Sequence, residues 1–372
     1  MKLGIIKETQ AGETRVAATP DTVKKICGKG LVVLIEKGAG SGSRYADTAY
    51  QEAGAELVDQ NTALAADIVF KVAYPNTDEL AQMSAGSLLV SHIDVCGENN
   101  PKLKALADSK VDAIAMQLIP RISRAQNMDA LSSQAGIAGY RAVIEAASLF
   151  GRFLPLMMTA AGSAKPAKVT VLGAGVAGLQ AIATARRLGA NVFGYDVRPQ
   201  VKGEIQSLGA KFIELDVGES GEGEGGYARE LSDEAKKRQT ELLTQELMTA
   251  DIIISTALIP CRQAPVLITE DAVKGMRPGS VIIDMAAANG GNCPLSKPNK
   301  TLTKHGIKIC GNTNFPAMMA ADASNFYARN LLNLLPLLVE GKAEEMHRKD
   351  LLEDEITEKS TVTFNGEVRF TR

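Results

Sequence analysis

The chain has no tryptophan, and aromatic side chains make up only 4% of its 372 residues. A sequence that is poor in aromatics but holds 34 glycines suits an α/β protein rich in alanine, glycine and valine better than an all-β one. The formal net charge of −2 gives no basic footprint for nucleic acid or for an anionic membrane surface. Nucleic-acid binding is therefore not expected.

Long apolar runs and metal-ligand patterns are also missing. The apolar run over residues 331–339 is too short to span a membrane, and the run over residues 146–164 is interrupted by Arg152 and Pro155. The five cysteines are scattered and form no CxxC or Cys/His spacing typical of a metal site. The sequence thus predicts neither a membrane-spanning segment nor a bound metal.

Short apolar runs alternate with helical patterns in two successive blocks, separated by a helical pattern that begins at Leu131. Strands that alternate with helices indicate parallel sheets with helices on both faces. Two further helical patterns, PDTVKKICGKG and NPKLKALADSK, begin with proline near the start, as helices often do. The expected strands are residues 3–6, 31–36, 67–72, 87–93 and 112–119, then a strand within 167–175, and residues 191–196, 251–258, 280–286 and 307–311.

A glycine pattern, Gly173-x-Gly175-x-x-Gly178, follows a β-branched strand and precedes a helical pattern. The first glycine permits a tight turn, the second lets the backbone approach a pyrophosphate, and the third lets the helix pack close to the strand. Asp196, at the end of the next strand, can accept hydrogen bonds from ribose hydroxyls and repel a 2′-phosphate. These features favour NAD(H), although the neighbouring Arg198 could accommodate a phosphate. The alternative is a glycine turn with Asp196 as a strand-end cap.

We therefore predict an α/β fold of two Rossmann-like, doubly wound parallel-sheet domains, joined by long helices with a cleft between them. The second domain is expected over residues 129–311. The first is expected over residues 1–128 plus 312–372, since the C-terminal helix returns to the first domain in the architecture of two-domain dehydrogenases. The tail carries Asn365-Gly366 between alternating residues, which predicts a β-hairpin.

A glycine-rich, acidic loop over residues 217–234 contains a single aromatic side chain, Tyr227. Its composition is typical of a solvated, disordered segment, and composition alone favours that interpretation. The functional alternative is a lid that closes over a cofactor and brings Tyr227 close to it.

Residues 121–134, RISRAQNMDALSSQ, hold many hydrogen-bonding side chains for a connector. Arginine, glutamine, aspartate and serine together offer the donors and acceptors that recognition of a carboxamide requires. The simpler interpretation is that Asp129 or Ser132 caps the following helix and that the arginines are solvated. Capping accounts for one of these residues, but not for all of them.

Three stretches, KETQAGETRVAATP, SRYADTAYQEAGAELV and GAGVAGLQAIATARRLGA, resemble the family that joins alanine dehydrogenases with NAD(P) transhydrogenases. The similarity covers essentially the whole chain. In alanine dehydrogenases, a lysine two positions after the first lysine of a KVKEP-like segment acts with a histidine on the next strand. Here that segment begins at Lys71, so Ala73 replaces the catalytic lysine, whereas Arg15 and His92 match. The acid/base machinery of an alanine dehydrogenase is therefore incomplete.

RISRAQNMDALSSQ, with TALIP, GNCPLS and GGYA, instead resembles the NAD(H)-binding component of proton-translocating transhydrogenase. The resemblance implies that Arg121 and Ser132 contact the nicotinamide carboxamide or its ribose, and that Asp129 fixes the local geometry. Gln126 would lie at the tip of the loop, facing a partner domain that carries NADP(H). These four residues are the candidate catalytic set. The candidate cofactor-binding residues are the same four with Leu131, Gly173, Ala174, Gly175, Val176, Gly178, Asp196, Val197, Arg198, Gly226, Tyr227, Thr256, Ala257 and Leu258.

The resemblance further implies direct hydride transfer from NADH to NADP⁺ on a partner subunit, coupled to proton translocation by a separate membrane component. Such a transfer needs two nicotinamide rings at near-attack distance rather than an acid, a base or a nucleophile. The implied partners are a second copy of the chain, the NADP(H)-binding subunit and the membrane-spanning component, with the chain in the cytoplasm at the inner membrane. Two alternatives stay open: an alanine dehydrogenase-type NAD-dependent oxidoreductase, and a non-catalytic NAD(H) sensor.

Overall fold

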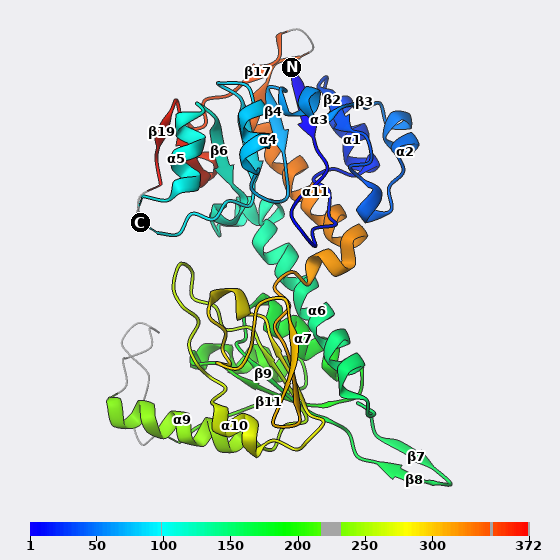
Figure 1. Ribbon diagram of the computed structural model, residues 1–372, viewed down its shortest axis with the longest axis vertical. Coiled ribbons are helices and arrows are strands. Elements are labelled where there is room, and N and C mark those ends of the chain that lie inside the picture. The colour runs from blue at the N-terminus through cyan, green and yellow to red at the C-terminus, as the bar shows by residue number, and fades with distance from the viewer. Residues whose placement is uncertain (98, 217–231, 343–344, 371–372) are drawn as a thin grey trace. The chain divides into compact units, whose positions relative to one another are not determined.

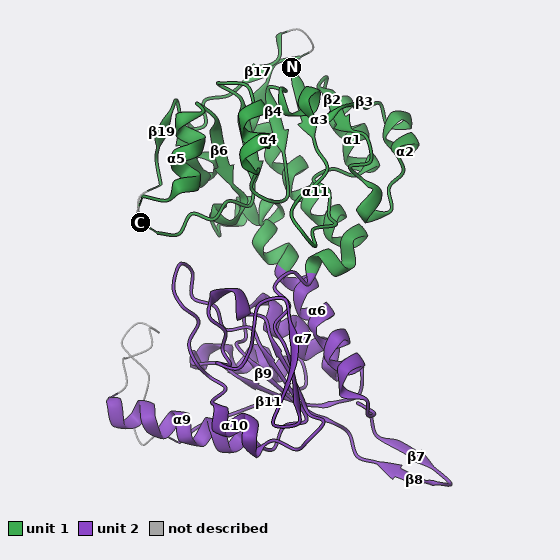
Figure 2. Ribbon diagram, viewed as in Figure 1, with its two compact units in different colours: residues 1–134, 316–372 green, residues 135–315 purple. Residues whose placement is uncertain are grey.

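The chain folds into two compact units, each built around its own β-sheet, as the computed structural model shows (Figures 1 and 2). The first unit combines Met1–Gln134 with Pro316–Arg372, and the second is Ala135–Phe315. The residues that the structure describes are 1–97, 99–216, 232–342 and 345–370.

The sheet of the first unit is doubly wound. Its strands are β1 (Lys2–Ile5), β2 (Val32–Glu36), β3 (Glu56–Val58), β4 (Ile68–Phe70), β5 (Leu88–Ser91), β6 (Asp112–Ala115), β18 (Thr361–Phe364) and β19 (Glu367–Val368). They lie in the order β19-β18-β6-β5-β4-β1-β2-β3. Strands β1 to β6 are parallel and follow the 3-2-1-4-5-6 order of a Rossmann sheet. β18 pairs antiparallel with β6, and β19 closes a hairpin.

Helices cover both faces of this sheet, and an apolar cluster fills the space on each side. α1 begins where Thr19 forms a capping box and Pro20 occupies the first turn. α11 packs in this unit, where its buried Tyr327 and Leu334 join the same cluster as Leu3 of β1. The helices are α1 (Pro20–Cys27), α2 (Asp47–Glu52), α3 (Gln60–Leu64), α4 (Thr77–Gln82), α5 (Pro101–Asp108), α11 (Ala320–Leu338) and α12 (Glu355–Ser360).

Two details of the first unit differ from the prediction, and one agrees. The strand expected over residues 112–119 ends at Ala115, because the Gln117 side chain hydrogen-bonds the backbone N–H and C=O of Ile93 where the ladder would have continued. β3 was not predicted, since three residues are too few to show an alternating pattern. The hairpin turn is confirmed, with Asn365 at φ 52° and Gly366 at φ 80°.

The second unit repeats the same winding. Its strands are β9 (Lys168–Leu172), β10 (Asn191–Tyr195), β11 (Lys211–Phe212), β12 (Ile252–Ser255), β13 (Val281–Asp284), β14 (Thr301–Lys304) and β15 (Ile307–Cys310). Their order is β11-β10-β9-β12-β13-β15-β14, parallel except for β14. The six parallel strands again have the Rossmann order, so the predicted α/β class is confirmed.

The helices of the second unit pack on both faces of its sheet. They are α7 (Val176–Arg187), α8 (Lys202–Ser207), α9 (Asp233–Leu247) and α10 (Glu270–Gly275), together with most of α6 (Ala130–Phe150). α6 confirms the long helix expected after Leu131. α9 was not predicted, and it takes in the last two residues of the acidic loop expected over 217–234. The rest of that loop lies outside the described residues.

A two-stranded hairpin of β7 (Met157–Thr159) and β8 (Gly162–Ala164) extends away from the sheet of the second unit (Figure 1). It carries exposed apolar side chains, with Met158 77% exposed and Leu156 56% exposed. Within the described residues, no helix has both the length and the apolar character needed to cross a membrane.

Candidate functional site

The glycine turn between β9 and α7 is shaped by close backbone contacts. Gly173 has φ 91°, a left-handed conformation that favours glycine. A Cβ on Gly178 would overlap the carbonyl oxygen of Gly173 and lie 2.8 Å from its carbonyl carbon. Gly175 caps α7 without any side-chain hydrogen bond, and a Cβ there would meet open space. The first N–H groups of α7 are thus left to a ligand or water, and the helix dipole favours an anion beside them.

The end of β12 fixes this turn from the neighbouring strand. Thr256 Oγ1 donates to the carbonyl oxygens of Leu172 and Gly173, at 3.2 and 3.1 Å. A Cβ on Gly173 would lie 2.8 Å from that hydroxyl, so the close approach of the two strand ends itself requires glycine. The crevice at the carboxyl ends of β9 and β12 is where the strand order reverses, the usual ligand position in such sheets.

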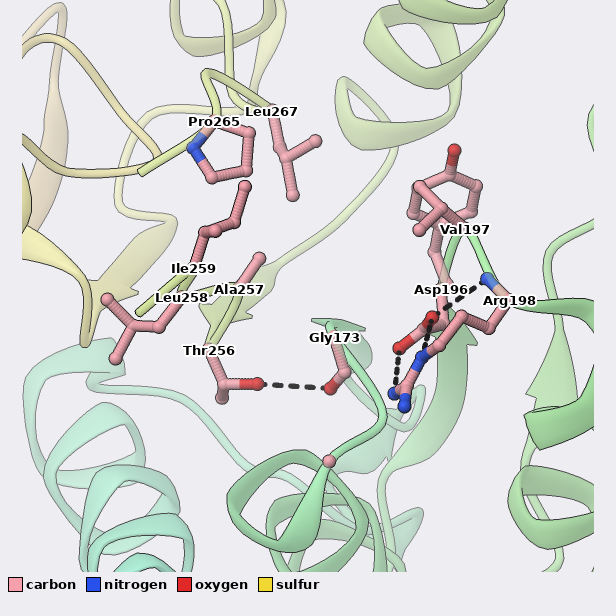
Figure 3. Close-up of a pocket in the computed structure, with 12 residues that line it drawn as sticks. Gly173, Asp196, Val197, Arg198, Thr256, Ala257, Leu258, Ile259, Pro265 and Leu267 are labelled. Carbon is pink, nitrogen blue, oxygen red and sulfur yellow. Dashed lines mark hydrogen bonds and ion pairs between the residues drawn. The ribbon is translucent and has the colours of Figure 1, made fainter. Parts of the chain in front are cut away.

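A cavity of about 420 Å³ opens at this crevice (Figure 3). The segment after β12 forms one wall, and the segment after β10 forms the opposite wall across the Gly173 turn. Apolar side chains dominate the first wall, and charged ones stand on the second. The lining residues are Gly173, Gly175, Tyr195, Asp196, Val197, Arg198, Thr256, Ala257, Leu258, Ile259, Pro265 and Leu267.

Asp196 binds both the glycine turn and its neighbour Arg198. Its Oδ2 accepts the N–H of Ala174 at 2.7 Å and Arg198 Nη2 at 2.9 Å, and its Oδ1 accepts Arg198 N and Nε at 2.9 Å. Burial would raise the pKa of Asp196, but the hydrogen bonds from Arg198 and Ala174 outweigh it and lower that pKa. Asp196 is therefore an anion at neutral pH. A ribose hydroxyl would have to share this carboxylate with Arg198, whose side chain is 52% exposed.

The polar segment 121–134 lies in the first unit and combines capped and exposed side chains. Asp129 caps α6: its Oδ1 accepts the N–H of Ser132 at 2.8 Å and its Oδ2 accepts the Ser132 hydroxyl at 2.6 Å. Arg121 and Gln126 are exposed. Arg124 forms a bidentate ion pair with Asp354, at 2.7 and 3.1 Å. Capping thus accounts for Asp129, and the serine hydroxyl keeps its lone pairs available to a donor such as a carboxamide.

Comparison with known proteins adds an independent line. Two family models match the chain, "Alanine dehydrogenase/PNT, N-terminal domain" over residues 4–138 and "Alanine dehydrogenase/PNT, C-terminal domain" over residues 142–371. The chain belongs to this family. The resemblance stated from the sequence is confirmed.

Individual relatives and structures agree with the family models. The chain is 50% identical to an NAD(P) transhydrogenase subunit alpha protein of Rhodospirillum rubrum, over 99% of this chain and 97% of that protein. It matches a transhydrogenase structure from Sinorhizobium meliloti at TM-score 0.89 and 41% identity, covering 99% and 100% of the two chains. An L-alanine dehydrogenase structure matches at TM-score 0.83 and 26% identity, covering 99% and 97%.

Within this member of the alanine dehydrogenase/PNT family, the structure brings part of the predicted cofactor set together. Gly173, Gly175, Asp196 to Arg198 and Thr256 to Leu258 line one cavity, while Ala174, Val176 and Gly178 build its turn. Gly226 and Tyr227 lie outside the described residues. The residues belonging to the first unit are Arg121, Gln126, Asp129, Leu131 and Ser132.

Sequence reasoning missed four residues that line the cavity: Tyr195, Ile259, Pro265 and Leu267. Tyr195 ends the strand before Asp196, and burial raises its pKa to about 12, so the phenol is neutral. The other three follow the expected strand 251–258, and attention to the whole of the apolar TALIP stretch would have found Ile259. Pro265 and Leu267 carry no local signal, because a later turn of the chain positions them.

The residues that match alanine dehydrogenases are held by neighbours in the first unit. Arg15 donates from Nε and Nη2 to Glu13 at 2.8 and 2.7 Å, and from Nη1 to Gln134 at 2.8 Å. His92 stacks on Tyr327 with ring centroids 5.3 Å apart. Burial and the positive charge of Arg15 lower the pKa of His92 to about 4, so its imidazole is neutral at pH 7.

Lys71 is also part of the interior rather than of an open site. Its side chain is 1% exposed, with Nζ 3.3 Å from Glu8 Oε2 and 3.2 Å from Glu79 Oε2. Burial raises the pKa of Glu8 although Lys71 opposes that effect. Among the described residues, no cluster of histidine, cysteine, aspartate or glutamate side chains is arranged to hold a metal ion.

Proposed function

We propose that the chain is the NAD(H)-binding part of an NAD(P) transhydrogenase, and that it passes hydride from NADH directly to NADP⁺ on a partner subunit. The observation that carries the proposal is the cavity over the α7 N-terminus, bounded by the glycine turn and by ionised Asp196. Relatives named as transhydrogenase alpha subunits support the reaction type. In the proposed complex, a separate membrane component couples the transfer to proton translocation.

The cavity suits a dinucleotide in shape and charge. The open space at Gly175 leaves room for a pyrophosphate against the first N–H groups of α7. The charge of Asp196 favours ribose hydroxyls and disfavours a 2′-phosphate. Val197 and Leu258 present apolar side chains, 61% and 52% exposed, that fit the faces of an adenosine.

Residues 121–134 supply orientation rather than acid/base chemistry in this proposal. Bound NADH would provide the hydride, so the chain has only to bind the cofactor and present its ring. Asp129 holds Ser132 so that the serine oxygen accepts from the carboxamide, and Arg121 donates to the carboxamide oxygen or the ribose. Gln126, exposed on the 3₁₀ helix η3 (Ser123–Met128), faces the NADP(H)-binding partner. Exclusion of water at that contact protects the transfer.

The partners belong to the same proposal. They are an NADP(H)-binding subunit, a membrane-spanning component to which this chain is peripheral, and a second copy of the chain. The β7–β8 hairpin offers a second copy its exposed Met158 and Leu156, since an isolated two-stranded hairpin is only marginally stable in water. Sedimentation of the purified chain at micromolar concentration tests the dimer, which a monomeric mass would rule out.

The second candidate is an alanine dehydrogenase-type oxidoreductase, which the 26% identical structural match favours. Three observations oppose it. Ala73 stands where the catalytic lysine is expected, Arg15 is already paired with Glu13, and His92 is neutral at pH 7. NADH oxidation that depends on pyruvate and ammonia would support this candidate.

The decisive experiment measures hydride transfer from NADH to an NADP⁺ analogue, with and without a transhydrogenase NADP(H)-binding domain. Gln126→Ala is compared with Gln51→Ala, which removes an exposed glutamine of the same chemistry on α2. We expect transfer only with the partner domain, at least tenfold slower for Gln126→Ala and unchanged for Gln51→Ala. Tight NADH binding without transfer under any condition would instead indicate an NAD(H) sensor.

A further inference from the structure

The loop over residues 258–264, which forms part of the apolar wall of the cavity, is anchored at both ends by one side chain. Asn292 Nδ2 donates to the carbonyl oxygen of Ala257 at 2.9 Å and to that of Pro265 at 2.8 Å. These two residues immediately precede and follow the loop. A primary amide has two N–H donors, and both are used here.

The rest of Asn292 is equally engaged. Its Oδ1 accepts the hydroxyl of Ser255 at 2.6 Å, and its backbone carbonyl accepts the N–H groups of Leu267 and Ile268 at 3.0 Å. The residue is 0% exposed. In such a buried position each hydrogen bond is protected from competition by water, and losing one leaves a polar group unsatisfied. Asn292 therefore links the end of β12 to both sides of the loop.

A buried carboxylate holds Asn292 itself in place. Asp284, at the end of β13, accepts the backbone N–H of Asn292 at 3.2 Å and that of Cys293 at 3.0 Å. Gly291 has φ 78°, and a Cβ there would lie 2.7 Å from Asp284 Oδ2. Residues 290–293 thus form a tight turn around Asp284, and the turn aims the Asn292 side chain at the base of the loop.

We propose that Asn292 is a positioning residue for the cofactor, acting as a clasp that keeps the loop 258–264 in place as a wall of the dinucleotide cavity. Asn292 does not line the cavity. It acts through Ala257, Pro265 and Leu267, which do. This inference rests on the proposed function in one respect only, that the ligand is NADH.

The geometry explains why asparagine is required at position 292. An aspartate keeps the acceptor for Ser255 but has no donor for the two carbonyl oxygens when ionised. A serine can donate one hydrogen bond and so can satisfy one end of the loop. An alanine satisfies neither end and leaves three polar groups in the interior without this partner.

The experiment compares Asn292→Ala and Asn292→Ser with Thr269→Ala. Thr269 caps α10 four residues beyond Pro265, so its loss lowers stability by about 1 kcal/mol without touching the cavity. NADH affinity is measured from NADH fluorescence, which carries no tryptophan background in this chain. Loop order is measured as the rate of tryptic cleavage after Arg262, in the presence of a thiol reductant that keeps Cys261 in one redox state.

For Asn292→Ala we expect at least a tenfold weaker affinity for NADH, faster cleavage at Arg262, and a raised KM for NADH with kcat retained at saturation. Asn292→Ser should fall between this variant and the original chain. Thr269→Ala should bind NADH normally despite its lower melting temperature. The proposal is overturned if Asn292→Ala is folded and keeps the original affinity and cleavage rate, or if Thr269→Ala weakens NADH binding equally.

Hydrogen exchange of the unsubstituted chain keeps the proposal testable if Asn292→Ala does not fold. The amide of Arg262 donates to Ile259 and that of Ala264 to Asn289, so both report on the loop. NADH should slow the exchange of both amides, and unchanged exchange at saturating NADH would refute the loop as a cavity wall. Failure of the original chain to bind NADH would count against the proposed function, whereas tryptic cleavage of the Asn292 variants would still test the clasp.

Discussion

The glycines of the turn should separate stability from cofactor binding. Gly178→Ala would force a Cβ against the backbone of Gly173, since the added atom would lie 2.8 Å from its carbonyl carbon and closer still to its oxygen. Gly175→Ala adds the same methyl group where nothing lies within 4 Å. Gly175 has φ −80°, so alanine adopts its backbone conformation without strain.

The magnitudes follow from these contacts. Overpacking against backbone costs about 1–3 kcal/mol, and alanine returns up to about 1 kcal/mol through its higher helix propensity. Because the neighbour is a carbonyl group that cannot swing away, we expect a net loss of about 2 kcal/mol for Gly178→Ala, or a melting temperature lower by about 4–8 °C. For Gly175→Ala the stability should stay within about 0.5 kcal/mol, but NADH affinity should fall at least about tenfold, or about 1.4 kcal/mol.

Thermal unfolding with and without NADH measures both quantities on the same samples, and fluorescence titration gives the affinity directly. Gly136→Ala is a suitable control, because the nearest atom to its added Cβ, Val176 Cγ1, is 4.0 Å away. If Gly175→Ala binds NADH with the original affinity, the pyrophosphate does not rest on this turn. If Gly178→Ala is as stable as the original chain, the close contact with Gly173 is not a constraint on the fold.

Three further perturbations test the first unit. Because folding lowers the pKa of His92 from 6.5 to about 4, stability should be complete above pH 6.5 and fall by up to about 3 kcal/mol as the pH drops to 4. Urea unfolding at several pH values measures this slope, and His92→Gln should flatten it. Lys71→Met leaves its two buried glutamate partners without a counter-charge and should cost about 3–5 kcal/mol at pH 7, with a smaller loss near pH 5 where a carboxyl can protonate. An equal loss at both values would contradict the ion-pair reasoning. Asp354→Ala should cost more than Arg124→Ala, by roughly 1 kcal/mol, because Asp354 also accepts the N–H of Ile356 as the cap of α12. Chemical denaturation of both variants measures the difference, and equal losses would show that the cap contributes nothing.

Local patterns were sufficient for most of the fold. The β-branched residues of β9, Pro20 at the start of α1 and Asn365-Gly366 in the hairpin each act within a few residues, so the sequence predicted them. Where a contact from elsewhere intervened, the prediction was wrong. The strand at 112–119 was too long because the side chain of Gln117 replaces the ladder beside Ile93.

The sequence by itself determined the glycine turn, the carboxylate at the end of the next strand, and the two-unit α/β architecture, because each depends on residue types at short spacings. Only the tertiary structure decided how these groups are held. Asp196 is paired with Arg198, and Asn292 joins Ala257 to Pro265 across the base of a loop. Such hydrogen bonds connect residues brought together by the winding of the sheet. An amide that satisfies two distant carbonyl groups therefore has no signature in the order of the residues around it.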